Sequence, residues 1–204
     1  MLIGLISDVH CNAEALDWAL ADLETRVDEI LLAGDAVYEY RFSDEVMEAA
    51  RRLDMPYVLG NHEIVLLGPH GERARSNPAI APENVDYMAS RPKRIDVVRD
   101  GKRICMVHAS PWAPYDQYVY STTPLLQDAA GLDDLDILVL GHTHIPMAER
   151  VGSTLVVNPG SLGEGRCPDH PQMVSYAVLD TDTEELEVVW GPNPRLVQQP
   201  TQVL

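Results

Sequence analysis

Residues 1–10 of the chain read MLIGLISDVH, an apolar run that ends in an aspartate and a histidine. An apolar run of this length that stops at a charged residue is typical of a buried strand. The run has no cationic leader, so we expect residues 1–7 to be the first strand of the core rather than a signal peptide. Asp8 and His10 then stand at the carboxyl end of that strand.

The next fifty residues alternate between helical and strand patterns. Asn12, a residue type that caps helices, precedes apolar residues at helical spacing in residues 13–27. Residues 29–33 are again apolar, Ser43 fits the start of a second helix, and residues 56–59 form a third apolar run. Strands that alternate with helices at this spacing predict βαβ units and a parallel sheet.

The second half of the chain is richer in strand patterns. Asp100 and Gly101 give a two-residue hairpin signal between the segments 94–98 and 102–108. Further strands are expected at residues 136–140, 154–157, 173–179 and 184–190.

Prolines and glycines interrupt the pattern in two other regions. Residues 68–92 are expected to be a surface excursion with one helix near residues 83–89, a candidate lid over the site. Residues 110–120 are expected to be an irregular loop, and Pro124 to start a short helix that Gly131 ends.

Length and composition predict one domain. A chain of 204 residues with 46% hydrophobic residues can bury one sizeable core. We expect residues 1–190 to form that domain and residues 191–204, which contain three prolines, to be an extended tail. The chain contains no run of eighteen apolar residues, so we expect no membrane-spanning helix. Its three widely spaced cysteines suit a reducing cytoplasm.

The formal charge of the chain is −17, from 32 acidic and 15 basic residues. Such a surface repels nucleic-acid backbones and anionic membranes, which argues against a long nucleic acid or a membrane as partner. A phosphate-binding site on this surface would need metal ions to reverse the local potential.

Short polar clusters follow five of the predicted strands. Each cluster alone also fits an ordinary turn or a structural histidine, but all five stand at the carboxyl end of a strand, where open α/β sheets bind ligands. Clusters distant in sequence can therefore converge. They are Asp8-Val9-His10, Gly34-Asp35, Gly60-Asn61-His62-Glu63, His108 and Gly141-His142-Thr143-His144.

The chemistry of these clusters predicts a metal centre. They offer two aspartates, one asparagine and up to five histidines, a set of oxygen and imidazole ligands that suits Mn, Fe, Zn, Co or Ni. The set exceeds what one tetrahedral ion needs, whereas two ions that share a bridging carboxylate would use all of it. Paired ions of this kind clamp the attacking and leaving oxygens of a phosphoryl centre.

The motif order D-x-H, G-D, G-N-H-E, H, G-H-T-H resembles that of the calcineurin-like metallophosphoesterase superfamily. The segments MVHASP at residues 106–111 and VNPGS at residues 157–161 are similar to its branch of small prokaryotic phosphodiesterases. The resemblance implies an α/β fold, a four-layer α/β/β/α sandwich of two mixed sheets flanked by helices.

The resemblance also implies a role for each polar residue. One metal ion would be bound by Asp8, His10, Asp35 and His144. The second would be bound by Asp35, Asn61, His108 and His142, with Asp35 as the bridge. Asn61 and His62 would contact the substrate, and His62 would act as general acid on the leaving oxygen.

The implied function is that of a binuclear-metal-dependent phosphoesterase. We expect a phosphodiesterase more than a phosphomonoesterase, in which a metal-bridging hydroxide attacks a small phosphate ester in line, with manganese as the first guess for the metal. The alternative is a catalytically weak, metal-containing protein-interaction scaffold of the same fold. A homo-oligomer in which strand edges of the C-terminal half pair between chains is a further alternative.

Two positions depart from the family pattern. Cys11 stands where this branch usually has glycine. Tyr38 stands where many relatives have an aspartate that pairs with the catalytic histidine, so the partner of His62 is open between Glu39 and Glu63.

Three groups of residues outside the motifs have alternative interpretations. Asn158, Gly160 and Ser161 fit a tight turn, which we favour, or support for the metal histidines. The loop aromatics either line a substrate wall or pack on the sheet edge; they are Trp112, Tyr115, Tyr118 and Tyr120. Arg73 and Arg75 either clamp a distal phosphate or are surface charge, and we favour the latter.

Overall fold

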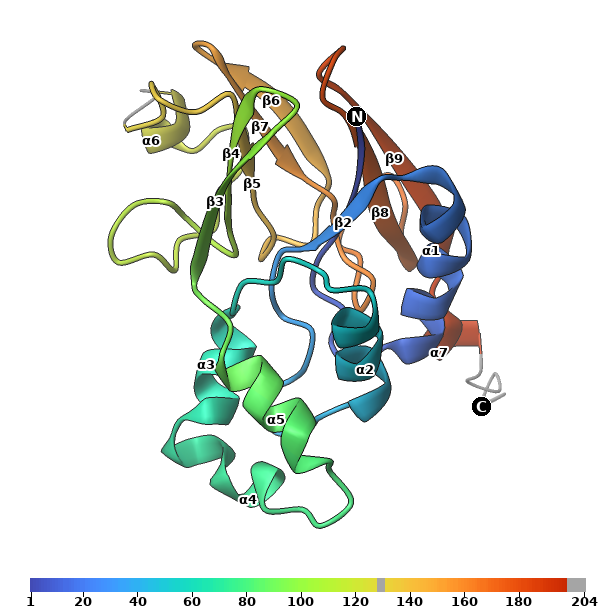
Figure 1. Ribbon diagram of the computed structural model, residues 1–204. Coiled ribbons are helices and arrows are strands. Elements are labelled where there is room, and N and C mark those ends of the chain that lie inside the picture. The colour runs from blue at the N-terminus through green and yellow to red at the C-terminus, as the bar shows by residue number, and fades with distance from the viewer. Residues whose placement is uncertain (128–130, 198–204) are drawn as a thin grey trace.

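Two mixed sheets face each other in the computed structural model, which describes residues 1–127 and 131–197 (Figure 1). The first sheet has the order β2-β1-β8-β9. Its strands β1 and β2 are parallel, whereas β8 is antiparallel to both β1 and β9. The bounds are β1 Leu2–Ile6, β2 Glu29–Leu32, β8 Met173–Asp180 and β9 Glu185–Pro192.

The second sheet has the order β3-β4-β5-β7-β6. Its central strands β4, β5 and β7 are parallel, and hairpin partners flank them on both sides. The bounds are β3 Arg94–Arg99, β4 Lys102–Val107, β5 Ile137–Val139, β6 Met147–Val151 and β7 Thr154–Asn158. The implied architecture of two mixed sheets with flanking helices is therefore confirmed.

Helices cover the outer faces and one end of the sandwich. Figure 1 shows α1 outside the first sheet, α6 outside the second, and α2 to α5 together beyond one end of the strands. The helix bounds are α1 Ala13–Arg26, α2 Asp44–Arg52, α3 Asn61–Leu67, η1 Pro69–Gly71, α4 Glu72–Arg75, α5 Pro82–Ala89, α6 Pro124–Gln127 and α7 Pro194–Val197. No helix in the described ranges is long and apolar enough to cross a bilayer.

The core lies in three layers that follow from the strand patterns. Ile3, Leu5 and Leu31 of the first sheet pack against Met106 and Val139 of the second. A larger cluster joins α1 and α2 to the outer face of the first sheet, and a smaller one lies outside the second sheet. Alternate residues of β1 therefore face different layers, so both faces of this strand are buried.

Several local predictions are confirmed. Ser43 caps α2, since its side-chain oxygen accepts a hydrogen bond from the Val46 amide, and α5 covers the predicted helix near residues 83–89. Asp100 and Gly101 both have positive φ in the β3–β4 turn, as a two-residue hairpin requires. Residues 128–130, part of the helix expected after Pro124, lie outside the described residues.

The predicted third strand at residues 56–59 is wrong as a full strand. The segment makes an isolated parallel bridge between Leu32 and Tyr57. Pro56 lacks an amide hydrogen, and the Leu59 amide donates to Pro92 rather than to β2. The segment thus lies beside β2 without extending the sheet.

Three other expectations need correction. Asn12 precedes α1 but does not cap it, because its side-chain amide donates to the Leu162 carbonyl and to Asn193. The strand β6 and the helices α3 and α4 were not predicted. Residues 194–197 form α7 rather than extended chain, while residues 198–204 lie outside the description and the domain division stays a prediction.

The topology brings the polar clusters to one place. The Asp8 amide donates to Gly34, which joins the ends of β1 and β2, and the Gly141 amide donates to His108, which joins the ends of β5 and β4. Across the sheets, the His142 amide donates to Oδ2 of Asp8 at 3.0 Å. Loops from both sheets therefore meet over the carboxyl ends of their strands.

Candidate metal centre

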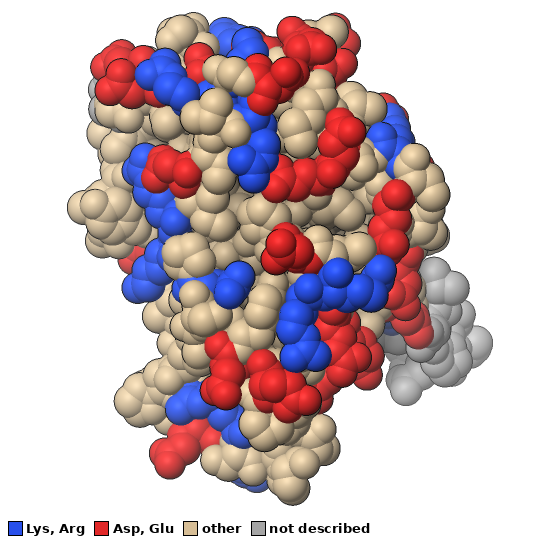
Figure 2. Space-filling view, in the orientation of Figure 1, with Lys and Arg blue, Asp and Glu red and all other residues tan. Residues whose placement is uncertain are grey.

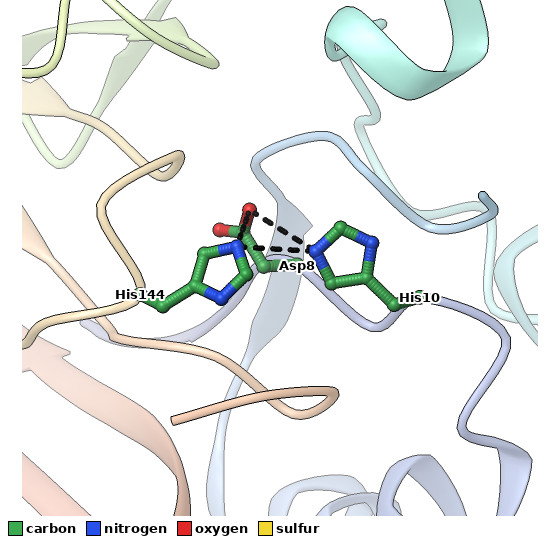
Figure 3. Close-up of side chains that lie close together, drawn as sticks. All are labelled: Asp8, His10 and His144. Atoms are coloured by element: carbon green, nitrogen blue, oxygen red, sulfur yellow. Dashed lines mark hydrogen bonds and ion pairs between the residues drawn. The ribbon is translucent and has the colours of Figure 1, made fainter. Parts of the chain in front are cut away.

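The first group of possible ligands contains Asp8, His10 and His144. Their ligand atoms lie within 4.8 Å of one another, and Figure 3 shows both rings turned toward the carboxylate. Nε2 of His10 lies 3.1 Å from Nε2 of His144, and Oδ1 of Asp8 lies 3.2 Å from the latter nitrogen. Three electron-pair donors from different segments thus face one point.

The second group contains Asp35, His108 and His142, again within 4.8 Å of one another. Nε2 of His108 lies 3.1 Å from Oδ2 of Asp35 and 3.1 Å from Oδ1 of Asn61. The structure therefore brings all seven sequence-predicted ligands into one buried region.

Asp35 lies between these two groups. It also forms a third group with His10 and His62, so its carboxylate reaches ligands from each side. Nε2 of His62 lies 3.7 Å from Oδ2 of Asp35, and the His62 amide donates to the other carboxylate oxygen at 2.9 Å. This position is the one that a shared carboxylate would need.

The backbone at the centre is held in an unusual conformation. Five of the seven predicted ligands have positive φ, between 49° and 68°. Such left-handed geometry costs about 1–2 kcal/mol for a residue with a side chain. Strain repeated at adjacent ligand positions indicates a functional constraint on the loops. The five residues are Asp8, His10, Asp35, His142 and His144.

Two motif glycines are required by close packing around the aspartates. A Cβ atom at Gly60 would overlap the Asp35 carboxylate, and one at Gly141 would overlap the side chains of Ser7 and Asp8. The glycines of the G-N-H-E and G-H-T-H motifs thus let neighbouring loops approach the ligands.

Hydrogen bonds from outside the centre orient several ligands. Oδ2 of Asp8 accepts from the Ser7 hydroxyl at 2.6 Å, while Oδ1 is buried with no hydrogen-bond partner. Nδ1 of His108 lies 2.7 Å from the Ala33 carbonyl, and Nδ1 of His144 lies 2.7 Å from the Glu164 carbonyl. Because a carbonyl oxygen only accepts, each Nδ1 is the donor here, which leaves Nε2 as the atom that would face a metal ion.

The electrostatics of the centre favour a cation. Burial would raise the pKa of Asp8 and Asp35, but neighbouring histidines, His108 first among them, hold both below the ordinary value. Burial would lower the pKa of His108, yet the Asp35 and Asp8 carboxylates raise it to about 10. The buried carboxylates therefore attract positive charge strongly.

Two further histidine ligands have the neutral form of the ring, which binds metal ions. Burial lowers the pKa of His10 and of His142 to about 4, so both rings are neutral ligands at neutral pH. Nε2 of His142 is buried without a hydrogen-bond partner, as is Oδ1 of Asp8. Neutral imidazoles, two carboxylates and unpartnered donor atoms form a set that fits divalent ions.

The structure distinguishes the two carboxylates considered for His62. Oε2 of Glu39 lies 3.3 Å from Nδ1 of His62, although this nitrogen makes no hydrogen bond. Tyr38 instead stacks on His10, with ring centroids 4.6 Å apart, and its hydroxyl donates to Glu164. Glu39 is thus the carboxylate beside the predicted acid.

Glu63 has a structural position. Its side chain is fully buried and accepts hydrogen bonds from the amides of Gly60, Asp35 and Val37 at 2.7, 3.0 and 3.1 Å. Burial, together with the Asp35 charge, raises the pKa of Glu63 to about 7. Glu63 therefore ties the start of α3 to the loop that carries Asp35.

The favoured interpretation of Asn158 and Ser161 as turn residues alone needs correction. The Asn158 amide donates to the Gly141 carbonyl at 2.7 Å and to the Thr143 hydroxyl at 3.1 Å. The Ser161 hydroxyl donates to the Asp8 carbonyl at 2.8 Å. Gly160 does form a turn with φ of 86°, but the two polar side chains brace the ligand loops.

The aromatic residues of the loop at residues 110–120 have different positions, and their role as a substrate wall stays a prediction. Tyr118 is exposed and stacks on His142, with centroids 3.9 Å apart, and Tyr120 lies parallel to it. Trp112 packs against the cluster outside the second sheet.

Cys11 has a backbone conformation that would suit a glycine. Its φ is +60°, a conformation that glycine adopts without strain. Burial raises the pKa of the thiol to about 11, so the side chain stays protonated at neutral pH. Cys11 is therefore a weakly reactive wall residue beside His10.

Sequence reasoning missed the residues that reach the centre from distant segments. Nη2 of Arg195, in α7, donates to the His10 carbonyl at 2.7 Å. Glu164 contacts both His144 and Tyr38. Neither residue belongs to a strand-end motif, so nothing in the sequence indicated its position. Ser7, which supports Asp8, could have been found because it is adjacent in sequence.

Comparison with known proteins defines the class. The chain matches the calcineurin-like phosphoesterase superfamily domain over residues 1–184 and belongs to that superfamily of metal-dependent hydrolases. Its structural neighbours include small prokaryotic and archaeal metallophosphoesterases and phosphodiesterases.

Individual relatives support this placement. The uncharacterized protein MJ0912 of Methanocaldococcus jannaschii is 29% identical over 214 residues, covering 92% of this chain and 86% of that protein. A metallophosphoesterase structure from Sphaerobacter thermophilus has 29% identity and a TM-score of 0.73, covering 94% of this chain and 88% of that one. Phosphodiesterase YfcE of Escherichia coli is 39% identical over 56 residues, 28% of this chain and 29% of that protein.

Replacement of Glu63 tests its bracing role. Glu63→Gln places an amide donor where one carboxylate oxygen accepts, so at least one buried amide loses its partner. We expect the free energy of unfolding, measured with urea, to fall by about 1–3 kcal/mol. Glu185→Gln, at an exposed position of β9, is the control. Equal stability of the two variants would contradict the assigned role.

Proposed function

We propose that this metallophosphoesterase is a phosphodiesterase with two divalent ions that share Asp35. Asp8, His10 and His144 would complete one site, and Asn61, His108 and His142 the other. The observation that carries the proposal is the position of Asp35, whose carboxylate lies within 4.8 Å of ligand nitrogens from both groups. Manganese remains the first metal to test, because availability as well as affinity selects the ion.

The proposed chemistry divides between metal and protein. When bound, the two ions would supply a Lewis acid that polarises the phosphoryl oxygens and activates water. His62 is the side chain that this chain offers as proton donor to the leaving oxygen, since it lies beside Asp35 without belonging to either main group. Glu39 lies beside the other ring nitrogen of His62, at 3.3 Å, where it would orient the ring.

A cavity next to the second group supports a small ester as substrate. It has a volume of about 430 Å³, and Asn61, His108 and His142 form part of its wall. Ile64 and Tyr115 add apolar surface, which suits the organic part of an ester. The preference for diesters rests on the family relationship to YfcE.

The surface charge supports a small substrate over a long nucleic acid. On the face in Figure 2, acidic and basic side chains are interleaved, without a continuous basic stripe. A polyanion gains little from such a surface.

Metal replacement tests the proposed activity. Chelator-treated protein should be inactive, and single addition of Mn, Ni, Co, Zn or Mg should show which ion restores turnover. We expect a transition metal to restore hydrolysis of bis(p-nitrophenyl) phosphate faster than that of p-nitrophenyl phosphate, measured by nitrophenolate release. Metal binding without turnover of either compound would instead favour the scaffold function.

Replacement of His62 tests its role as proton donor. In His62→Ala we expect kcat for a diester to fall by about 10²–10⁴-fold, the usual contribution of a general acid. Metal content per chain should remain that of the wild type, because His62 is outside the two proposed ligand sets. His170→Ala, whose ring stacks on Trp190, is the matched control. Full activity of His62→Ala, or loss of an ion, would refute the role.

A further inference from the structure

A second cavity adjoins the metal centre on the side of His10. Its volume is about 800 Å³, and Arg41, Arg73 and Arg195 line it; we refer to it as the arginine cavity. We propose that the arginine cavity binds a second phosphate group of the substrate, distinct from the one hydrolysed. This inference rests on the proposed phosphodiesterase function and extends it to a substrate class.

Three guanidinium groups without a carboxylate partner gather in this one cavity, whereas the other unpaired basic side chains of the described residues do not line it; these are Arg51, Arg75, Arg91 and Lys93. Acidic residues outnumber basic ones by 32 to 15, and eight of the basic side chains form ion pairs within the described residues. None of Arg41, Arg73 and Arg195 has a carboxylate within 4.0 Å among the described residues. The basic side chains that form ion pairs there are Arg26, Arg52, Arg94, Arg99, Lys102, Arg103, Arg150 and Arg166.

Two of these guanidinium groups are held in place by neutral partners. Arg41 lies over the Tyr38 ring, 4.4 Å from guanidinium carbon to ring centroid. Arg195 donates from Nη2 to the His10 carbonyl at 2.7 Å. Since an arginine carries five N–H donors, each side chain keeps donors for a ligand while its position is fixed. Arg73, in α4, makes no such contact with the described residues and remains free to close on a ligand.

The local charge of the arginine cavity is positive. Glu45 is the one carboxylate among its lining residues, against three guanidinium groups. The Glu45 carboxylate already accepts a hydrogen bond from the Ser43 hydroxyl at 2.8 Å, at the start of α2. A concave, positive surface on a chain of charge −17 is a selective site for an anion.

The arginine cavity is close enough to the centre to act on the same molecule. Cys11 forms part of its wall and directly follows His10 in sequence. Tyr38 connects the two sites, because its ring stacks on His10 and carries Arg41 on it. The paired N–H groups of an arginine bind two oxygens of one phosphate. An uncharged organic group offers no matching pair of acceptors.

Arg73 and Arg75, which sequence alone could not distinguish, have different positions. Nη1 of Arg75 donates to the carbonyls of Leu66 and Gly68 and holds α4 against α3. Arg73 alone of the two lines the arginine cavity. Arg51, an exposed arginine of α2 that does not line the cavity, offers a matched control.

A binding experiment tests the site without turnover. Inorganic phosphate is titrated by calorimetry into full-length, chelator-treated protein, in which the carboxylates of Asp8 and Asp35 disfavour an anion at the metal centre. We expect one phosphate per chain, with affinity reduced about tenfold or more in Arg73→Gln and unchanged in Arg51→Gln. No binding to the wild type, or equal affinity in the two variants, would overturn the site.

A substrate pair then tests whether the phosphate belongs to the substrate. Thymidine 5′-(4-nitrophenyl phosphate) is compared with its 3′-phosphorylated derivative, using metal-loaded enzyme. We expect the 3′-phosphate to raise kcat/KM about tenfold, and Arg73→Gln but not Arg51→Gln to abolish that ratio. Absence of the advantage alongside phosphate binding would assign the site to free phosphate and overturn the substrate role. Failure to hydrolyse either compound would count against the phosphodiesterase function itself.

Discussion

The buried carboxylates of Asp8 and Asp35 set the main constraint on this molecule, because they lie among histidines and away from solvent. Isolated buried anions are strongly unfavourable, so they must be balanced by positive charge. The His108 ring shows how strong that demand is, since its pKa is raised to about 10 despite burial. The proposed divalent ions would satisfy the demand and would supply catalytic capacity. The remaining structure, from the strand order to the glycines of the motifs, keeps these groups together.

The two-sheet fold meets this constraint by joining loops from both sheets. Ligands from β1 and β2 meet ligands from β4 and β5, and the His142 amide connects the sheets through Asp8. Left-handed backbone at five ligands places side chains from short loops in one small region. Such strain persists only when the surroundings fix it, and buried Glu63, Asn158 and Ser161 provide that bracing.

Sequence predicted the ligand-bearing loops because polar residues that follow apolar runs are a local signal. It also predicted the hairpin at Asp100 and the capping by Ser43, which depend on near neighbours. It did not choose between Glu39 and Glu63, and it assigned Asn12 to a cap, because these side chains bond to distant segments. Arg195 could not be associated with His10 for the same reason: α7 reaches the centre only in the folded chain.

The central feature of the proposed metal centre is that Asp35 serves two ions at once. Anomalous diffraction from crystals of the manganese-loaded protein measures this without reference to any substrate. We predict two anomalous peaks per chain, one beside His10 and His144 and one beside His108 and His142, with Asp35 oxygens ligating both. A single peak, or two peaks of which only one contacts Asp35, would contradict the shared-carboxylate centre.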